Sequence, residues 1–301
     1  ISLAAKSKVD AIKFQTYITE DFINDKDKKR FKILKKFELS HSQFLDLKKF
    51  AHKNKVHFIS TPLDIKSSDF LIKNADIIKI ASSDNNFFPM LDKVVKSNKN
   101  VIISTGLINF KQINFLKNRI YRLIGKYKAH EKIAFLHCVT SYPVKDEFAN
   151  LNSIKYLREK LNFTIGYSDH TLGNDAVMIA TSLGAKIIEK HFTINKNYSS
   201  FRDHKLSADF TDLNEMVTKI KRIEILLGKF EKNIQKCEKK FLNIIRRSPF
   251  AKKDIKKGEK FSIENVKFLR DSNSKNFYTF KKFIGKKSVK FFQKNQKIFL
   301  K

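Results

Sequence analysis

Seven short apolar runs recur along the first two thirds of the chain, and this repeat restricts the fold more than any other feature. Each run ends in small or polar residues, and the segments between them carry helical periodicity, as in Ser42–His52 after a candidate N-cap at Ser40. Apolar strands that alternate with amphipathic helices predict a parallel sheet covered by helices. The runs are Ala11–Phe14, Val56–Ile59, Ile77–Ala81, Val101–Ile103, Ile133–Cys138, Phe163–Gly166 and Lys186–Ile188.

Right-handed crossovers leave two architectures for such a repeat, an open doubly wound sheet or a closed barrel. An open sheet usually carries a glycine-rich phosphate loop after its first strand, and this sequence has none there. Seven strands are one short of a closed (β/α)8 barrel, and Ile1–Lys8 resembles the tail of a helix. We therefore expect a TIM-type α/β barrel that lacks its first strand in this chain.

The character of the sequence changes after a predicted helix at Leu213–Leu227. We expect residues 1–228 to form the barrel, residues 229–243 to form a lysine-rich linker, and residues 244–301 to form a small basic domain. In that domain, Arg247–Ala251 and Phe261–Leu269 are predicted strands, and Gly258 is predicted to lie in a turn.

Composition narrows the classes of function. The 301 residues are 42% hydrophobic and contain no apolar stretch of the roughly 18 residues needed to span a bilayer, so we expect a cytoplasmic protein without a membrane partner. The net charge of +32 raises nucleic acid as a partner. However, the lysines are spread along the whole chain, which favours steering of a small anionic substrate instead. Cys138 and Cys237 lie far apart in the sequence, which argues against a disulfide framework or a zinc site.

Polar residues follow the predicted strands, where a barrel places its catalytic groups. Lysines and hydroxyls at these ends, such as Lys13, Lys79 and Ser104, suit a phosphate. His170 and His191 end neighbouring strands and could hold one divalent metal ion. Each residue also has a simpler interpretation, because a lysine at a strand end is usually solvated and a lone histidine is usually part of the core. His130 and His137 are expected to be structural.

The sequence motifs at these strand ends resemble those of the N-acetylneuraminate synthase family. The tail from Arg246-Arg-Ser-Pro-Phe through Lys253-Asp-Ile-Lys-Lys-Gly-Glu is similar to that family's antifreeze-like (SAF) domain. The motifs that carry the resemblance are Lys13-Phe-Gln-Thr-Tyr, Phe58-Ile-Ser-Thr-Pro, Ile78-Lys-Ile-Ala-Ser, Ile103-Ser-Thr-Gly, Leu136-His-Cys-Val-Thr-Ser-Tyr-Pro, Gly166-Tyr-Ser-Asp-His-Thr-Leu-Gly and Ile188-Glu-Lys-His-Phe-Thr.

This resemblance implies a transferase that condenses phosphoenolpyruvate with N-acetylmannosamine or a related N-acyl hexosamine to give a sialic acid. The open alternatives are a legionaminate- or pseudaminate-type synthase that uses a diacetamido sugar, an inactive fragment of such an enzyme, and a nucleic-acid-binding protein. The family's first strand carries a catalytic acid that this chain lacks, so we expect the chain as given to be catalytically deficient.

The resemblance also implies roles for individual residues. His170 and His191 would bind a divalent metal, manganese first and magnesium or cobalt as alternatives. In a domain-swapped homodimer, Arg270 would reach the sugar of the partner subunit. The loop after Arg270 lacks the family's Pro-Gly-x-Gly. The implied phosphoenolpyruvate ligands are Lys13, Lys79, Ser82, Ser104, Ser168 and Thr140, the last at a position where asparagine is common. The other implied sugar ligands are Gln15, Asp84, Tyr142 and Asp203.

Overall fold

The computed structural model describes residues 1–198, 202–242, 244–271 and 279–300. The chain divides into two compact units, Ile1–Gly228 and Lys229–Lys301. No helix among the described residues combines the length and apolarity that a bilayer crossing requires. The loop that follows Arg270, on which the Pro-Gly-x-Gly comparison rests, lies at residues 272–278 and is outside the described part of the chain.

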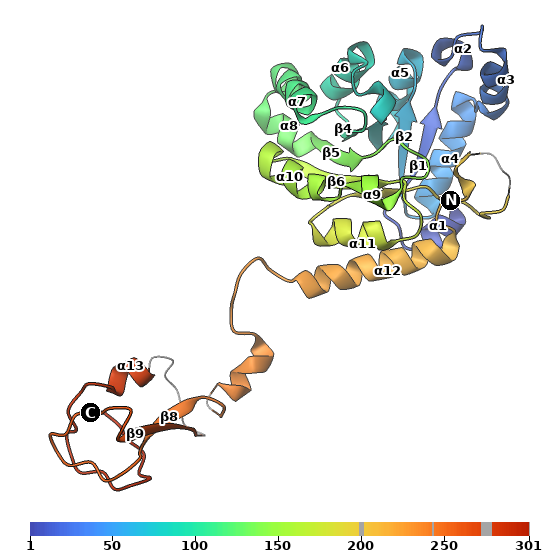
Figure 1. Cartoon of the computed structure of the whole chain (residues 1–301). Helices are drawn as coiled ribbons and strands as arrows, with labels where there is room; N and C mark the ends of the chain where they lie inside the picture. The colour runs from blue at the N-terminus through green and yellow to red at the C-terminus, as the bar shows by residue number, and fades with distance from the viewer. Residues whose placement is uncertain (199–201, 243, 272–278, 301) are drawn as a thin grey trace. The chain divides into compact units, whose positions relative to one another are not determined.

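The first unit is built on one parallel sheet whose strands follow one another in sequence order, with β1 and β7 at its two edges. Figure 1 shows this sheet with its helices. This is the TIM-type α/β barrel, short of one strand, that the repeat predicts. Its strands are β1 (Ala11–Thr16), β2 (His57–Pro62), β3 (Ile77–Ile80), β4 (Asn100–Ser104), β5 (Ile133–Cys138), β6 (Thr164–Asp169) and β7 (Ile188–Lys190).

The last of the seven predicted strands was placed too early in the sequence. The apolar run Lys186–Ile188 suggested the strand, but the ladder with β6 joins Tyr167 to Ile188 and continues to Lys190. The sequence Glu189-Lys190-His191 is charged and therefore lacks the apolar signature of a buried strand. It nevertheless forms β7 because its charged side chains find partners on both faces of the sheet, as described below.

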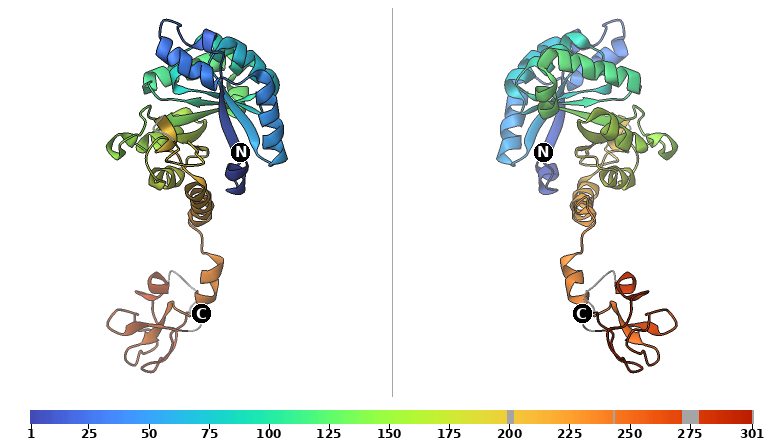
Figure 2. Two further views of the ribbon diagram at one scale, coloured as in Figure 1. Left: turned by 90° about the vertical axis from the view of Figure 1, so that its right-hand side faces the viewer. Right: turned by 90° about the vertical axis from the view of Figure 1, so that its left-hand side faces the viewer.

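Helices cover the outer face of the curled sheet, as the two side views in Figure 2 show. The predicted cap at Ser40 is confirmed, since its hydroxyl accepts a bond from the Gln43 N–H and the Gln43 side chain returns one to Ser40. The helices of this unit are α1 (Ser2–Lys6), α2 (Thr19–Phe22), α3 (Lys28–Phe37), α4 (His41–Lys53), α5 (Ile65–Asn74), α6 (Phe88–Lys96), α7 (Phe110–Ile124), α8 (Lys126–Lys132), α9 (Asp146–Ala149), α10 (Asn152–Leu161), α11 (Asp175–Ser182) and α12 (Phe210–Leu227), with short 3-10 turns η1 (Ser82–Asp84) and η2 (Arg202–His204).

Side-chain alternation along the strands separates two apolar layers. Ile78, Ile80 and Phe135 point outward and join the large core between the sheet and the helices. Burying each such side chain contributes about 1.5–3 kcal/mol to stability. A smaller inner cluster includes Ile59 and Leu136 and fills the inside of the curled sheet. The inner face is therefore sealed by apolar residues, which leaves its carboxyl end for polar groups.

The second unit is a small β-rich module. Strands β8 (Arg247–Ala251) and β9 (Val266–Arg270) pair antiparallel, and the 3-10 turn η3 (Lys236–Phe241) and helix α13 (Thr279–Phe283) complete its elements. Its own core includes Ile255, Phe261 and Phe292, which are at most 1% exposed. Gly258 lies at a φ of +86°, in the turn predicted there.

Candidate active site

The carboxyl ends of the seven strands present a polar cluster to the inside of the sheet. Because successive side chains of a strand point to opposite faces, residues next to the outward Ile78 and Ile80 point inward. Residues that lie opposite each other on neighbouring strands point to the same face, as Gln15 and Thr61 do, and as Ser168 and Glu189 do. The inward positions nearest the carboxyl ends are Lys13, Gln15, Thr61, Lys79, Ser104, Cys138, Ser168 and Glu189.

Lys79 stands at the centre of this cluster and is only 3% exposed. Its Nζ donates to Ser104 Oγ at 2.6 Å and lies 3.5 Å from Glu189 Oε1. Burial lowers the pKa of the Lys79 ammonium, and the carboxylate of Glu189 opposes that shift. An ammonium with one short hydrogen bond retains donor capacity for an anionic ligand.

Glu189 is the residue of this cluster to which the sequence analysis gave no role. Its Oε1 accepts a bond from Ser168 Oγ at 2.8 Å. Burial raises the pKa of the Glu189 carboxyl, but Lys13 and Lys79 outweigh it and bring the pKa to about 2. Glu189 is therefore ionised and balances part of the charge of the two lysines. Its place two residues before His191 is visible in the sequence, but its register with Ser168 is seen only in the ladder of β6 and β7.

The Thr61 hydroxyl of the cluster has no partner among the residues that the structure describes. Thr61 is 1% exposed, and its Oγ1 makes no hydrogen bond to any described residue. Its neighbour Ser60 faces the other way and bonds Thr16 across β1 and β2 at 2.7 Å. A buried hydroxyl without a partner costs free energy, so Thr61 is a natural contact for a ligand that enters the cluster.

Ser82 and Thr140 meet at the turn after β4. The Gly106 N–H donates to Ser82 Oγ at 3.1 Å. A side chain at Gly106 would place its Cβ 2.4 Å from Thr140 Oγ1 and 2.6 Å from Ser82 Oγ. The Asn85 amide holds the same turn through the carbonyls of Ser104 and Gly106. The glycine therefore allows these two hydroxyls to approach the end of β4.

The two imidazoles also lie together. The ring centroids of His170 and His191 are 5.3 Å apart, and the Tyr142 ring packs on His170 at 4.3 Å. His170 Nδ1 lies 2.9 Å from the carbonyl oxygen of Val139. A carbonyl can only accept, so Nδ1 carries a proton, and Nε2 keeps a free lone pair when the ring is neutral. Burial lowers the pKa of His170, but Cys138 and the Val139 carbonyl outweigh it and raise the pKa, so a metal ion would compete with a proton for Nε2.

This arrangement fits a divalent metal. A nitrogen that binds an ion at about 2.1 Å puts its ring centre roughly 3.2 Å from that ion, so two rings at about 90–110° would be roughly 4.6–5.3 Å apart. Burial lowers the pKa of His191, and the positive charges of Lys13 and His170 lower it further, to about 4. The His191 imidazole is therefore neutral near pH 7. No group of three or more histidine, cysteine or acidic residues suited to a metal occurs in the described part of the chain. An ion here would therefore keep positions for water or substrate oxygens.

Of the residues expected near a sugar, Tyr142 and Asp203 lie beside the imidazoles. Asp203 Oδ2 lies 3.8 Å from His191 Nδ1, and Gln15 is exposed on β1. Burial raises the pKa of the Asp84 carboxyl. Burial also raises the pKa of the Tyr142 phenol to about 12, so it remains a hydrogen-bond donor. Arg270 is exposed on β9 of the second unit.

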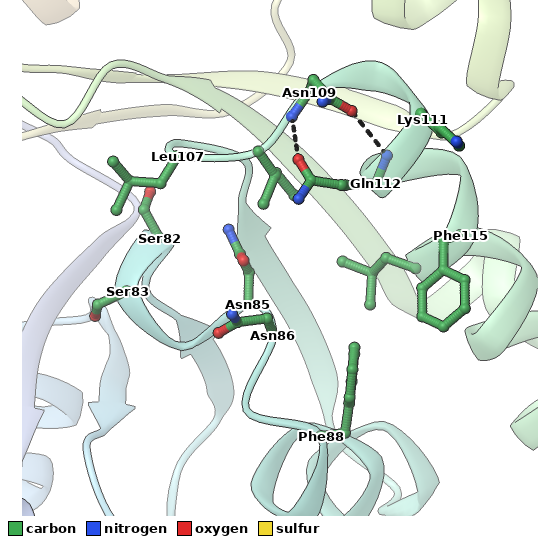
Figure 3. Close-up of a pocket in the computed structure, with 12 residues that line it drawn as sticks. Ser82, Ser83, Asn85, Asn86, Phe88, Leu107, Asn109, Lys111, Gln112 and Phe115 are labelled. Carbon is green, nitrogen blue, oxygen red and sulfur yellow. Dashed lines mark hydrogen bonds between the residues drawn. The ribbon is translucent and has the colours of Figure 1, made fainter.

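A pocket of about 610 Å3 opens beside the cluster, between η1 and the start of α7 (Figure 3). Phe88 and Phe115 form an apolar wall, and Leu107, with a φ of +64°, stands near Ser82 in the same view. Among the strand-end residues named above, only Ser82 lines this pocket. The pocket therefore lies next to the polar cluster and does not contain it.

Two histidines that the sequence analysis assigned to structure do have partners in the core. His137 Nε2 lies 2.8 Å from the Ala149 carbonyl oxygen. The His130 ring packs 4.4 Å from that of Phe163. His204 Nδ1 lies 2.7 Å from Thr193 Oγ1. Both cysteines are free, and Cys138 is buried with its Sγ 4.0 Å from His170 Nδ1.

Comparison with known proteins gives a consistent result. The NeuB family model matches residues 1–232. An uncharacterised protein of Methanocaldococcus jannaschii is 45% identical over 272 residues, covering 89% of this chain and 77% of that protein. N,N'-diacetyllegionaminic acid synthase of Campylobacter jejuni is 35% identical over 312 residues, covering 99% and 92%.

Solved structures of similar proteins share the fold of this chain. The N-acetylneuraminic acid (sialic acid) synthetase of Leptospira borgpetersenii, in complex with citrate, superposes with a TM-score of 0.73 at 33% identity, covering 79% of this chain and 81% of that chain. A protein from Chromobacterium violaceum, described as a spore coat polysaccharide biosynthesis protein E, has a TM-score of 0.83 at 24% identity, covering 98% and 91%. At that identity the second likeness supports the fold alone.

Proposed function

The chain belongs to the NeuB family, and from that premise we propose that it is a nonulosonic acid synthase that condenses phosphoenolpyruvate with an N-acyl hexosamine. Two of its relatives are named for such products, a diacetyllegionaminic and a pseudaminic acid synthase of Campylobacter jejuni, at 35% and 34% identity. The observation that carries the proposal is the convergence of Lys13 and Lys79 with the imidazole pair at one end of the sheet.

Phosphoenolpyruvate is a dense anion, and the inner cluster supplies donors that suit it. We assign Lys13, Lys79 and Ser104 to its phosphate and carboxylate, together with Ser168, whose single hydroxyl proton would turn from Glu189 to the ligand. Thr61 is a further contact because its hydroxyl has no partner among the described residues. Ser82 and Thr140 would complete the donors from the turn after β4. Several fixed donors orient the enol for reaction, which lowers the entropic part of the barrier.

His170 and His191 would hold a divalent ion, manganese being the first choice, and when bound it would polarise the aldehyde of the open-chain sugar. The protein's own part is to orient the two imidazoles and to keep that of His191 neutral. Val139 fixes the tautomer of His170, and burial with nearby charge keeps the pKa of His191 low. Tyr142, packed against His170, would limit where the sugar aldehyde can lie.

The acceptor would lie above this centre, within reach of Gln15, Asp84, Tyr142 and Asp203. Carbon 3 of the enol bonds to the aldehyde carbon, and the aldehyde oxygen takes up a proton. Water then adds at carbon 2, and phosphate leaves as the carbon 2 ketone forms. We further propose that residues 244–301 act as an antifreeze-like domain and that Arg270 reaches the sugar of a partner subunit in a homodimer.

Two measurements test the proposal. Calorimetry with phosphoenolpyruvate tests the anion site without requiring turnover. Phosphate release with manganese and either N-acetylmannosamine or a 2,4-diacetamido hexose, followed by mass spectrometry of the nonulosonic product, tests the reaction and identifies the acceptor. Absence of phosphoenolpyruvate binding would contradict the assignment of the cluster.

A further inference from the structure

Asp169 and Lys190 form an ion pair on the outer side of the last two strands. They stand immediately before His170 and His191 in the sequence, and alternation turns them away from the inner cluster. Lys190 Nζ lies 2.6 Å from Asp169 Oδ2, and the two side chains are 2% and 0% exposed. The pair joins β6 to β7 at the residues that immediately precede the two histidines.

The hydrogen bonds of this pair are saturated. Lys190 Nζ also donates to the carbonyl oxygens of Thr171 at 2.6 Å and Gly173 at 3.0 Å, which uses its three protons. Asp169 Oδ1 accepts from the Tyr167 hydroxyl at 3.0 Å, and from the N–H and hydroxyl of Thr171, each at 2.8 Å. A network in which every member is satisfied is rigid and has no capacity for a ligand.

We propose that this network, called here the Asp169–Lys190 brace, positions the two imidazoles and so sets the affinity of the site for a divalent ion. His170 lies between Asp169 and Thr171, which are both held by the brace. His191 follows Lys190, so the brace links the backbones that carry both rings. Partners outside the ligand shell typically change metal affinity about 10- to 100-fold when they are removed.

The fold has other supports at this place, so loss of the brace need not unfold it. The carbonyl oxygen of His170 accepts from the Val144 N–H at 2.9 Å, and that of His191 accepts from the Ala208 N–H at 2.8 Å. These bonds hold the backbone near each histidine but do not connect β6 to β7. The ladder of β6 and β7 joins the two strands but ends at Asp169 and Lys190, one residue before each histidine. We therefore expect the spacing of the rings to depend on the brace more than the fold does. This inference rests on the metal site of the proposed function.

The test compares manganese dissociation constants, read from the electron paramagnetic resonance signal of free Mn²⁺, for the unmodified chain and two brace variants. Asp169→Asn/Lys190→Met removes both charges together, because Lys190→Met alone would leave a buried carboxylate without a counterion. Tyr167→Phe removes only one hydroxyl donor. The matched control is Asp92→Asn/Arg119→Met, which removes the bidentate pair between α6 and α7, away from the site.

We expect the double brace variant to raise the manganese dissociation constant about 10- to 100-fold. Tyr167→Phe should raise it about two- to tenfold, the range for one hydrogen bond. The control should lose thermal stability while its dissociation constant stays within about twofold of the unmodified chain. An unchanged constant in the folded double variant overturns the inference. If that variant does not fold, an unchanged constant in Tyr167→Phe overturns it. Failure of the unmodified chain to bind Mn²⁺ would contradict the metal site itself.

Discussion

Replacement of Lys79 by methionine should remove phosphoenolpyruvate affinity and leave the fold intact. Lys79 Nζ has one short bond, to Ser104, and its side chain is 4% exposed. A charge-assisted hydrogen bond to a phosphate oxygen contributes about 1.5–3 kcal/mol. Its loss therefore raises the dissociation constant roughly 10- to 150-fold.

The fold should tolerate this change because the lysine is costly to bury. Burial lowers the pKa of Lys79, which shows that the site disfavours its charge. Methionine has a similar length and fills the same space without a charge. Glu189 keeps Lys13 and the Ser168 hydroxyl as partners, so no carboxylate is left isolated. We expect unfolding free energy to change by less than about 1.5 kcal/mol, as for volume-conserving substitutions.

The assay is calorimetry with phosphoenolpyruvate and, separately, with the amino sugar. Lys99→Met is the matched control, since Lys99 Nζ donates to the Ala75 carbonyl oxygen at 2.6 Å near the amino ends of β3 and β4. The control should keep phosphoenolpyruvate affinity within about twofold, because the site lies at the other end of the strands. Equal losses for both ligands in the Lys79 variant would refute the reasoning and make Lys79 a structural residue.

Three further outcomes are expected. Glu189→Gln should bind inorganic phosphate roughly 30- to 150-fold more tightly at pH 6.5 by calorimetry, since one unit charge about 6 Å away costs about 2–3 kcal/mol at a dielectric near 20; weaker binding would contradict its role as a counter-charge. Gly106→Ala should lower the unfolding free energy by about 1–3 kcal/mol in urea titration, because its Cβ would meet Thr140 Oγ1 at 2.4 Å. Burial raises the pKa of Asp76, but bonds from His52 and a backbone N–H outweigh it and lower the pKa, so its stabilisation is present above about pH 4 and is lost as pH falls through the folded pKa. Asp76→Asn should therefore be less stable by about 1.5–3 kcal/mol at pH 7, with the difference shrinking below pH 4 in unfolding titrations.

Much of the barrel could be predicted from the sequence because apolar side chains on the outer face of its strands pack against the helices, and further apolar side chains fill the inner face. Ile78 and Ile80 mark β3, and the same alternation places Lys79 inside. The position of β7 could not be read in this way. Glu189 and Lys190 are charged, and only tertiary pairing across β6 shows that both are satisfied within a strand.

The candidate site was likewise predictable only in part. The strand ends predicted where Lys13, Lys79, His170 and His191 would gather, because parallel strands bring their carboxyl ends to one edge. They could not predict that Glu189 joins the lysines. A glutamate in a charged tripeptide is normally solvated, and its burial depends on Ser168 and Lys79 from distant strands.

The two buried ion pairs at the end of the sheet differ in how completely they are bonded. Lys190 and Asp169 have a partner for every proton and both carboxylate oxygens. Lys79 makes one short bond and two contacts of 3.4 and 3.5 Å, and the nearby Thr61 hydroxyl has no partner among the described residues. Unsatisfied buried donors are costly in a folded protein unless a ligand completes them. Incomplete bonding on the inner face therefore supports our proposal that an anion binds there, and the saturation of the outer pair supports the proposed role of the brace in holding that place in shape.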